Sequence, residues 1–64
     1  MSAEKMKLAL SVTETAQALG VSRPTVYQLL RRSDFPAFRI GNRWLISRSG
    51  LEAWIKTQAE NQNE

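Results

Sequence analysis

The sequence contains neither cysteine nor histidine. Without cysteine there can be no disulfide and no thiolate nucleophile, and without both residue types the usual zinc sites cannot form. The absence of histidine also removes the commonest acid–base group near neutral pH. A chain of 64 residues must therefore be stabilised mainly by its small hydrophobic core, which two tryptophans and several branched aliphatic residues can supply.

Long hydrophobic runs are also missing. No uncharged stretch approaches the roughly 18 apolar residues of a membrane span, and no secretory signal is visible. There are no repeats or linkers either. We expect one cytoplasmic domain over residues 1–64, with an ordered core at about 8–58 and polar ends that fray. We expect no bound metal, no cofactor and no membrane contact.

The charge is unevenly distributed. The net charge is +3, but residues 21–50 carry six arginines and one aspartate, for a net charge of +5. Arginine makes forked contacts with phosphate and guanine, so this segment suggests a polyanionic partner. A solvated basic surface without a partner is the alternative on charge alone.

A first helix is expected to begin at Ser11. The stretch "SVTE" is a capping box, in which Ser11 and Glu14 each accept from the other's backbone amide. Apolar residues follow at helical spacing, and Gly20 occupies the position where a helix ends with positive φ. Leu8 and Leu10, just before this helix, are expected either to pack on the domain or to form a short edge strand.

A second helix is expected to begin after Ser22, because serine caps helices and Pro24 suits a first turn. Asp34 and the pair Phe35-Pro36 should close it, since the residue before a proline is pushed out of the α region. The apolar stripe of this helix is Val26, Leu29 and Leu30.

A hairpin is expected around Gly41-Asn42, and two registers compete. A two-residue loop pairs Ile40 with Arg43, whereas a three-residue loop pairs Ile40 with Trp44. The second register places four large apolar residues on one face, and we predict it because it buries more apolar surface. Those residues are Phe38, Ile40, Trp44 and Ile46.

The predicted register has consequences for three other residues. Arg39 and Leu45 would face away from the core, and Arg43 would lie in the tip. After the hairpin, "SGLE" reads as a second capping box, from Ser49 to Glu52, that opens a third helix. The fold class is therefore α+β and mostly helical.

The joint between the first two helices is informative. Ala16 is small enough for a close helix crossing, Gly20 allows the backbone to reverse, and Val26 can pack into the crossing. This spacing favours a helix-turn-helix over an ordinary helical hairpin. The stretches "TETAQALGVSRPTVYQLLRR", "FPAFRIGNRW" and "SRSGLEAW" together resemble the small winged helix-turn-helix domains of the excisionase family, which are related to the DNA-binding domains of MerR-type regulators.

The resemblance implies that the second helix enters a DNA major groove while the hairpin, the wing, reaches the backbone or the adjacent minor groove. It also implies a bacterial, phage or mobile-element origin. Two positions depart from the family pattern. Asp34 stands where glycine is common, and Gly50 replaces a common acidic residue.

The candidate DNA-binding residues follow from these placements. Gln28 can pair with adenine and Arg23 with guanine, while hydroxyls near the helix N-terminus can meet phosphate or bases. Arginines outside the base-reading face are expected to contact phosphate, with a solvated side chain as the alternative. In the second helix the candidates are Ser22, Arg23, Pro24, Thr25, Tyr27, Gln28, Arg31 and Arg32; for the wing and backbone they are Arg39, Gly41, Asn42, Arg43 and Arg48.

Sequence-specific binding to double-stranded DNA is the leading hypothesis. By resemblance, an excisionase would bend DNA and help a cognate integrase, and a small transcriptional regulator on the same fold is the alternative. A protein-interaction module is a third reading, with Trp44, Trp54 or Leu45 as an exposed anchor; both tryptophans fall on inward faces, which leaves Leu45. An enzyme is not expected, since Glu14 and Glu52 are assigned to caps and no nucleophile–base pair is present. We expect a monomer in solution that assembles cooperatively on DNA.

Overall fold

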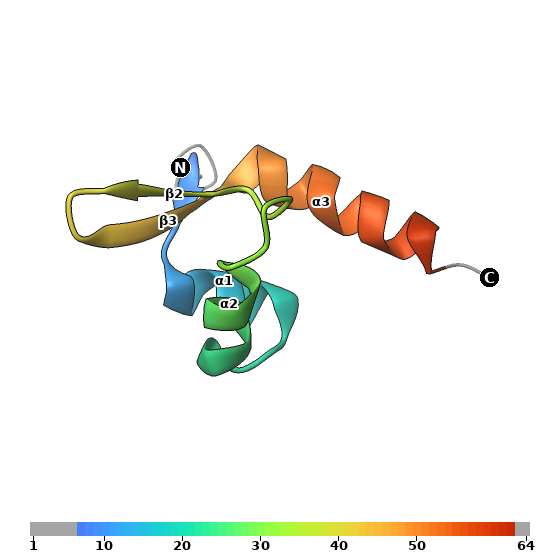
Figure 1. Cartoon of the computed structure of the whole chain (residues 1–64), viewed down its shortest axis with the longest axis horizontal. Helices are drawn as coiled ribbons and strands as arrows, with labels where there is room; N and C mark the ends of the chain where they lie inside the picture. Colours follow the sequence, from blue (N-terminus) through green and yellow to red (C-terminus); the bar gives the residue numbers. More distant parts are fainter. Residues whose placement is uncertain (1–6, 63–64) are drawn as a thin grey trace, which may run out of the picture.

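The computed structural model describes residues 7–62; the polar lead-in before Lys7 and the last two residues lie outside the described part of the chain. Figure 1 shows a hairpin extending to one side, a long helix to the other and two short helices below. In chain order the elements are β1 (Ala9–Leu10), α1 (Val12–Leu19), α2 (Arg23–Leu29), β2 (Ala37–Ile40), β3 (Arg43–Ser47) and α3 (Arg48–Asn61).

The first helix, α1, begins and ends as predicted. The Ser11 N–H donates to Glu14 Oε1 at 2.9 Å, and the Glu14 N–H donates to Ser11 Oγ at 3.1 Å. At the other end Gly20 has φ 74°, and its N–H donates to the Ala16 carbonyl at 2.9 Å. Because positive φ costs glycine little, the chain can turn sharply here into α2.

The second helix, α2, begins at the predicted place but is shorter than predicted. Ser22 is its N-cap, and Pro24 lies in its first turn. The helix ends at Leu29 rather than near Asp34. Beyond it the Arg31 and Arg32 N–H groups bond to carbonyls three residues back, at 3.2 and 3.0 Å. The last turn is therefore wound more tightly, and the chain leaves the helix before it reaches Phe35-Pro36.

The hairpin adopts the two-residue loop, so the predicted register is wrong. Ile40 pairs with Arg43, and Arg39 pairs with Trp44. Gly41 has φ 62° and Asn42 does not have positive φ, which is the pattern of a type II′ turn. This turn matches the twist of the strands, and the turn geometry sets the register.

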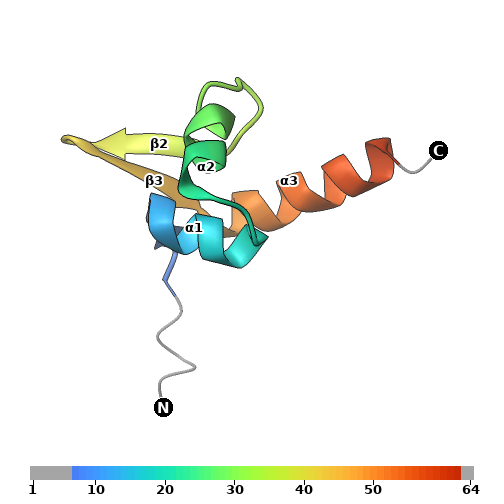
Figure 2. The same ribbon diagram turned by 90° about the horizontal axis from the view of Figure 1, so that it is seen from below.

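The observed register changes which residues the hairpin buries. Ile46 is fully buried and Trp44 is half-buried, whereas Phe38 and Ile40 lie on the opposite face with 39% and 62% of their surface exposed. Leu45 lies on that outer face, as predicted. The expected burial of Phe38 and Ile40 fails because the observed register places both residues on the face of the hairpin that points away from the core. Figure 2 shows the tip of the hairpin extending past α1 and α2.

A short third strand completes the sheet. In the order β1–β3–β2, Leu10 pairs antiparallel with Ile46, so the edge strand suggested before α1 is present. Leu10 packs against the core, but Leu8 is 89% exposed.

The third helix, α3, begins two residues earlier than the predicted capping box. Its N-cap is Ser47, whose Oγ accepts from the Gly50 N–H at 3.0 Å, so the assignment of Ser49 and Glu52 to a capping box is wrong. The chain passes directly from β3 into the helix. A Cβ added at Gly50 would lie 2.7 Å from Pro36 Cβ, which explains why glycine occupies this position.

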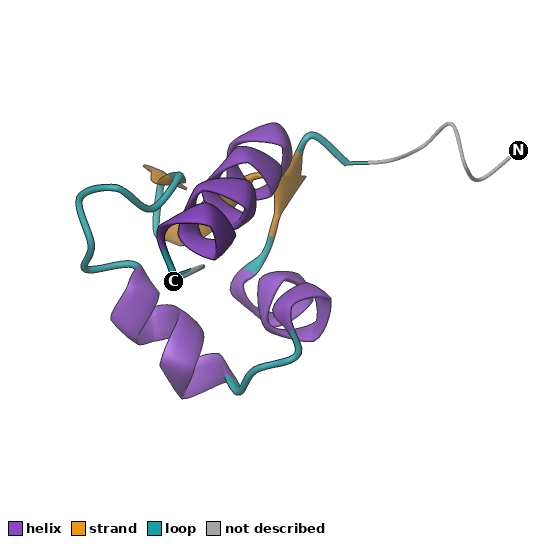
Figure 3. Ribbon diagram, turned by 90° about the vertical axis from the view of Figure 1, so that its right-hand side faces the viewer, coloured by secondary structure: helices purple, strands orange, loops and turns teal. Residues whose placement is uncertain are grey.

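The core lies where α1, α2, β3 and α3 meet. Ala16 and Val26 are buried at the crossing of α1 and α2, as predicted. Figure 3 looks along α3 and shows α1 and α2 beneath it. The buried apolar residues are Val12, Ala16, Val26, Phe35, Ile46 and Leu51.

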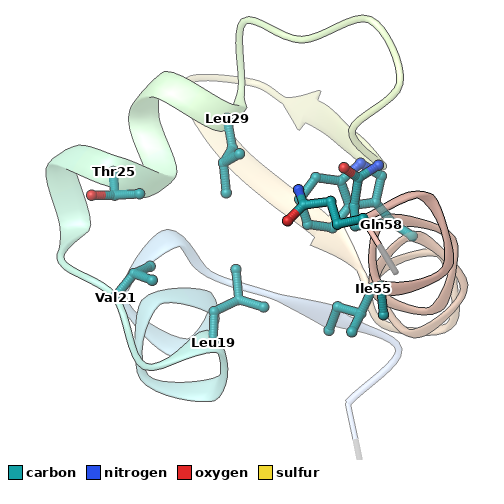
Figure 4. Close-up of a pocket in the computed structure, with 9 residues that line it drawn as sticks. Leu19, Val21, Thr25, Leu29, Ile55 and Gln58 are labelled. Carbon is teal, nitrogen blue, oxygen red and sulfur yellow. The ribbon is translucent and has the colours of Figure 1, made fainter. Parts of the chain in front are cut away.

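An open groove of about 590 Å³ separates the α1–α2 pair from α3. Figure 4 shows Leu19 and Leu29 on one side of it and Ile55 on the other. Trp54 lines the groove and packs against the core, so α3 is anchored by its first half while its second half extends away from the body (Figure 1).

Candidate nucleic-acid interface

Helix α2 presents one buried and one exposed face. Val26 has no exposed surface, whereas Tyr27 is 47% exposed and Gln28 is exposed. Since residues at a spacing of three to four share a helix face, Pro24 and Gln28 lie opposite Val26. The residues predicted to read DNA bases are therefore the residues that α2 offers to solvent.

The hydroxyls near the start of α2 are engaged with each other. Ser22 Oγ lies 2.9 Å from Thr25 Oγ1 and accepts from the Thr25 N–H at 3.4 Å. Thr25 also lines the groove, from the side of α2 (Figure 4). Both residues act in the cap, and their predicted DNA contacts stay predictions.

The wing carries its two arginines on opposite faces. Arg39 shares the face of Trp44, with its guanidinium carbon 5.5 Å from the ring centroid and Nη2 donating to the Gly41 carbonyl at 3.5 Å. The prediction that Arg39 lies on the face away from the core is therefore wrong, although its side chain is exposed. Arg43 is the first residue of β3 rather than part of the tip, which is Gly41-Asn42 alone.

A hollow of about 250 Å³ joins α2 to the wing. Tyr27 contributes to it from α2, and Asn42 and Arg43 contribute from the hairpin. The structure thus brings together candidates that are 15 residues apart in sequence. A surface formed by a helix and a hairpin tip has the shape that a nucleic-acid backbone could follow between two grooves.

Four residues of this hollow were not predicted to belong to the site. Ser11, Val12 and Thr13 line it from the start of α1, and Trp44 lines it from β3. The capping box at Ser11 was the signal that could have indicated Thr13, because it marks a helix N-terminus with free backbone N–H groups. For Trp44 the signal was the two-residue hairpin loop, which is the register that we did not predict.

The six central arginines separate into two groups. Three are engaged within the protein: Arg32 with Asp34, Arg39 with Trp44, and Arg48 with Glu52. Within residues 7–62 the other three have no side-chain partner, and all are exposed. These three are Arg23, Arg31 and Arg43.

The engaged arginines differ in how firmly they are held. Arg32 and Asp34 form two hydrogen bonds of 2.9 Å, from Nε to Oδ1 and from Nη2 to Oδ2. The Arg32 guanidinium lowers the pKa of the Asp34 carboxyl below its usual range, and a hydrogen bond from Trp54 adds to the effect. Arg48 makes a longer contact of 3.6 Å to Glu52 along α3.

The described part of the chain shows neither a metal site nor a membrane-spanning helix. Among residues 7–62 no group of three or more acidic side chains is placed to hold a metal ion. No helix in that range is long and apolar enough to cross a membrane.

The fold and its surface define a winged helix-turn-helix, in which α1 and α2 form the helix-turn-helix and β2 and β3 the wing. The comparison with protein families agrees. Residues 9–59 match the family model of the helix-turn-helix domain, and the chain belongs to that family. The helix-turn-helix fold of this family supports binding to DNA.

The curated relatives include one protein of Mycobacterium bovis and proteins of two strains of Mycobacterium tuberculosis, each named only as an uncharacterized protein. Each is 34% identical over 55 residues, which is 86% of this chain and 48% of the relative. The chain thus spans about half the length of these relatives. No solved structure matches it with significance.

Proposed function

We propose that the protein binds double-stranded DNA in a sequence-specific manner, with α2 in the major groove and the wing on the adjacent backbone. The observation that carries this proposal is the position of the unengaged arginines. Arg23 begins α2, Arg31 follows its end, and Arg43 lies on the wing. Cations at these positions flank a helix face that offers Gln28 and Tyr27 to a ligand.

Two kinds of contact are expected in this arrangement. Gln28 has the amide needed to pair with adenine, and Arg23 has the fork needed for guanine, so both are assigned to base reading. Arg31 and Arg43 are assigned to phosphate, since they lie at the ends of the surface. No catalytic step is assigned to any residue, and the protein acts by binding.

The biological role that we propose is that of an excisionase, which assists a cognate integrase of a phage or mobile element. Its support is the resemblance of the helix-turn-helix and wing motifs to that family. A small transcriptional regulator is the alternative on the same fold. An excision assay with the integrase encoded nearest to this gene, run beside a promoter reporter, separates the two roles.

DNA binding itself is tested by titrating labelled duplexes at several salt concentrations. Binding should weaken steeply with salt, because each phosphate contact releases condensed counterions. Salt-independent or undetectable binding would rule out the proposed interface.

Two substitutions distinguish base reading from phosphate contact. Gln28→Ala should change which duplex sequences are preferred, at a cost of about 1–3 kcal/mol for the preferred site. Arg43→Ala should weaken all duplexes alike and reduce the salt slope by about one. Selection of binding sites from a random duplex pool measures the first effect, and salt titration measures the second. A Gln28→Ala variant with unchanged preference would remove α2 from base reading.

A further inference from the structure

Arg32 differs from its neighbour Arg31 in what its side chain contacts. Arg31 has no partner within residues 7–62, whereas Arg32 makes a two-pronged contact to the Asp34 carboxylate, with both hydrogen bonds at 2.9 Å. Its guanidinium carbon also lies 5.8 Å from the centroid of the Trp54 ring, on α3. Arg32 is thus directed towards α3.

The carboxylate that holds Arg32 is itself held from α3. The Trp54 Nε1–H donates to Asp34 Oδ2 at 3.3 Å. The Trp54 ring meets Phe35 edge to face, with centroids 5.0 Å apart and planes at 90°, and Phe35 is buried. We call Arg32, Asp34 and Trp54 the Arg32 clip. Because one end of the clip is fixed to the core, Asp34 stays in place to hold the guanidinium.

A carboxylate bound in this way occupies the donors that a phosphate would use. Arginine recognises carboxylate and phosphate through the same pair of parallel N–H groups, so Arg32 cannot serve both at once. The pair is about half exposed, at 49% and 46% of the two side chains, and exposed ion pairs are weak enough to be exchanged.

We propose that Asp34 is a positioning residue that holds Arg32 away from DNA and so limits the affinity of this domain for the phosphate backbone. This inference rests on the proposed DNA-binding function. It also gives a role to the acidic residue at the turn after α2. Because Asp34 binds Arg32, α2 and the turn after it present two arginines to DNA instead of three. These two are Arg23 and Arg31.

The central test is Asp34→Asn, measured by titration of a non-specific duplex at several salt concentrations. Asparagine keeps an oxygen for the Trp54 N–H but no longer attracts the guanidinium. We expect binding to tighten by about three- to tenfold near 0.1 M salt, and the slope of log K against log salt to steepen by about one, as one phosphate contact is gained.

Two controls separate the release of Arg32 from a general change in charge. Glu60→Gln alters the net charge equally on an exposed position of α3 and should change the affinity less than twofold. Asp34→Asn should have no effect in an Arg32→Gln background, because the cation to be released is absent. Arg32→Gln alone should bind nearly as well as the unmodified chain, while Arg31→Gln should bind less well.

Each of these binding measurements either supports or overturns the proposed role of Asp34. The inference is overturned if Asp34→Asn leaves affinity and slope unchanged, if the gain persists in the Arg32→Gln background, or if Arg32→Gln weakens binding as much as Arg31→Gln. Should Asp34→Asn fail to fold in a thermal melt, the comparison of Arg32→Gln with Arg31→Gln still decides. Failure of the unmodified chain to bind DNA is a separate result, which overturns the proposed function itself.

Discussion

At the scale of the residue, Thr15 has an unusual environment. It is the polar residue that is fully buried within the described chain, and its Oγ1 has no hydrogen-bond partner among residues 7–62. A buried hydroxyl without a partner carries the cost of its lost hydration, about 1–3 kcal/mol. The side chain nevertheless fills its space with a β-branched shape that valine shares.

Thr15→Val should therefore stabilise the protein. We expect the free energy of unfolding to rise by about 1 kcal/mol, which corresponds to an increase in melting temperature of about 4–8 °C for a domain of this size. Thermal and urea denaturation by circular dichroism measure it. Thr13→Val, on the exposed side of α1, is the matched control and should have little effect. A loss of stability in Thr15→Val would show that the hydroxyl has a partner in solution.

The residues that begin and end α1 were well predicted, because their requirement is local. Ser11, Glu14 and Gly20 could be assigned because a cap needs only groups within four residues along the chain. Gly50 could not be explained in this way. Its reason is the close approach of Pro36, which comes from another segment and is visible only in the folded chain.

At the scale of the element, the wing depends on its turn. The loop is Gly41-Asn42, and Gly41 has φ 62° with open space around its Cβ position. Gly41→Ala should lower the free energy of unfolding by about 1 kcal/mol, because the penalty is backbone strain rather than a clash. Asn42→Ala should cost less. Comparison of the two by urea denaturation tests the two-residue loop, and equal effects would contradict it.

The start of α1 is expected to depend on pH. The Glu14 carboxylate accepts from Lys7 Nζ at 2.7 Å and from the Ser11 N–H at 2.9 Å. The Lys7 hydrogen bond, followed by that of Ser11, lowers the pKa of Glu14 in the folded state. A lowered folded-state pKa means that the ionised carboxylate stabilises the fold above its usual range and that this contribution is lost as the pH falls through the lowered value.

Melting temperature should thus stay level between pH 7 and about 5 and decline at more acidic pH. Asp34 contributes in the same direction, since the Arg32 hydrogen bonds lower its pKa too. Glu14→Gln should be less stable than the unmodified chain at pH 7, and the difference should shrink in acid. A difference that grows as the pH falls would contradict the assigned sign.

The hairpin shows why an element can be predicted while its register is missed. Two strands around Gly41-Asn42 were evident from the alternation and the turn residues. We predicted the register that places Phe38 and Ile40 on the face of Trp44, because it would bury more apolar surface. The two-residue turn at Gly41-Asn42 sets the register instead, and it places Phe38 and Ile40 on the opposite face.

At the scale of the whole molecule, the elements project in two directions from a small core. The principal extents are 40, 29 and 19 Å, which reflects the wing on one side and the second half of α3 on the other. On DNA, the wing and α2 would act together as one surface. We propose that the protein is a monomer in solution and assembles cooperatively on DNA.

Cooperative assembly predicts two measurable behaviours. Sedimentation should give a single species near the chain mass of 7.3 kDa without DNA. Titration of a duplex long enough for several copies should give a binding curve steeper than that of a single site, whereas a duplex for one copy should not. A dimer in the absence of DNA would contradict the first expectation, and identical curves the second.

The order of the elements, the helix-turn-helix joint and the exposed face of α2 could be read from the sequence, because caps, turn residues and hydrophobic spacing act within a few residues of the chain. The cap of α3 is also a local contact, from the Gly50 N–H to Ser47, but the sequence pattern misplaced it by two residues. The folded chain was needed to show that Arg39 meets Trp44 and how the wing is paired, since these contacts join two strands. It was needed too for the contact of Asp34, which binds Arg32, with Trp54 on α3, because no local pattern reports a contact over 20 residues.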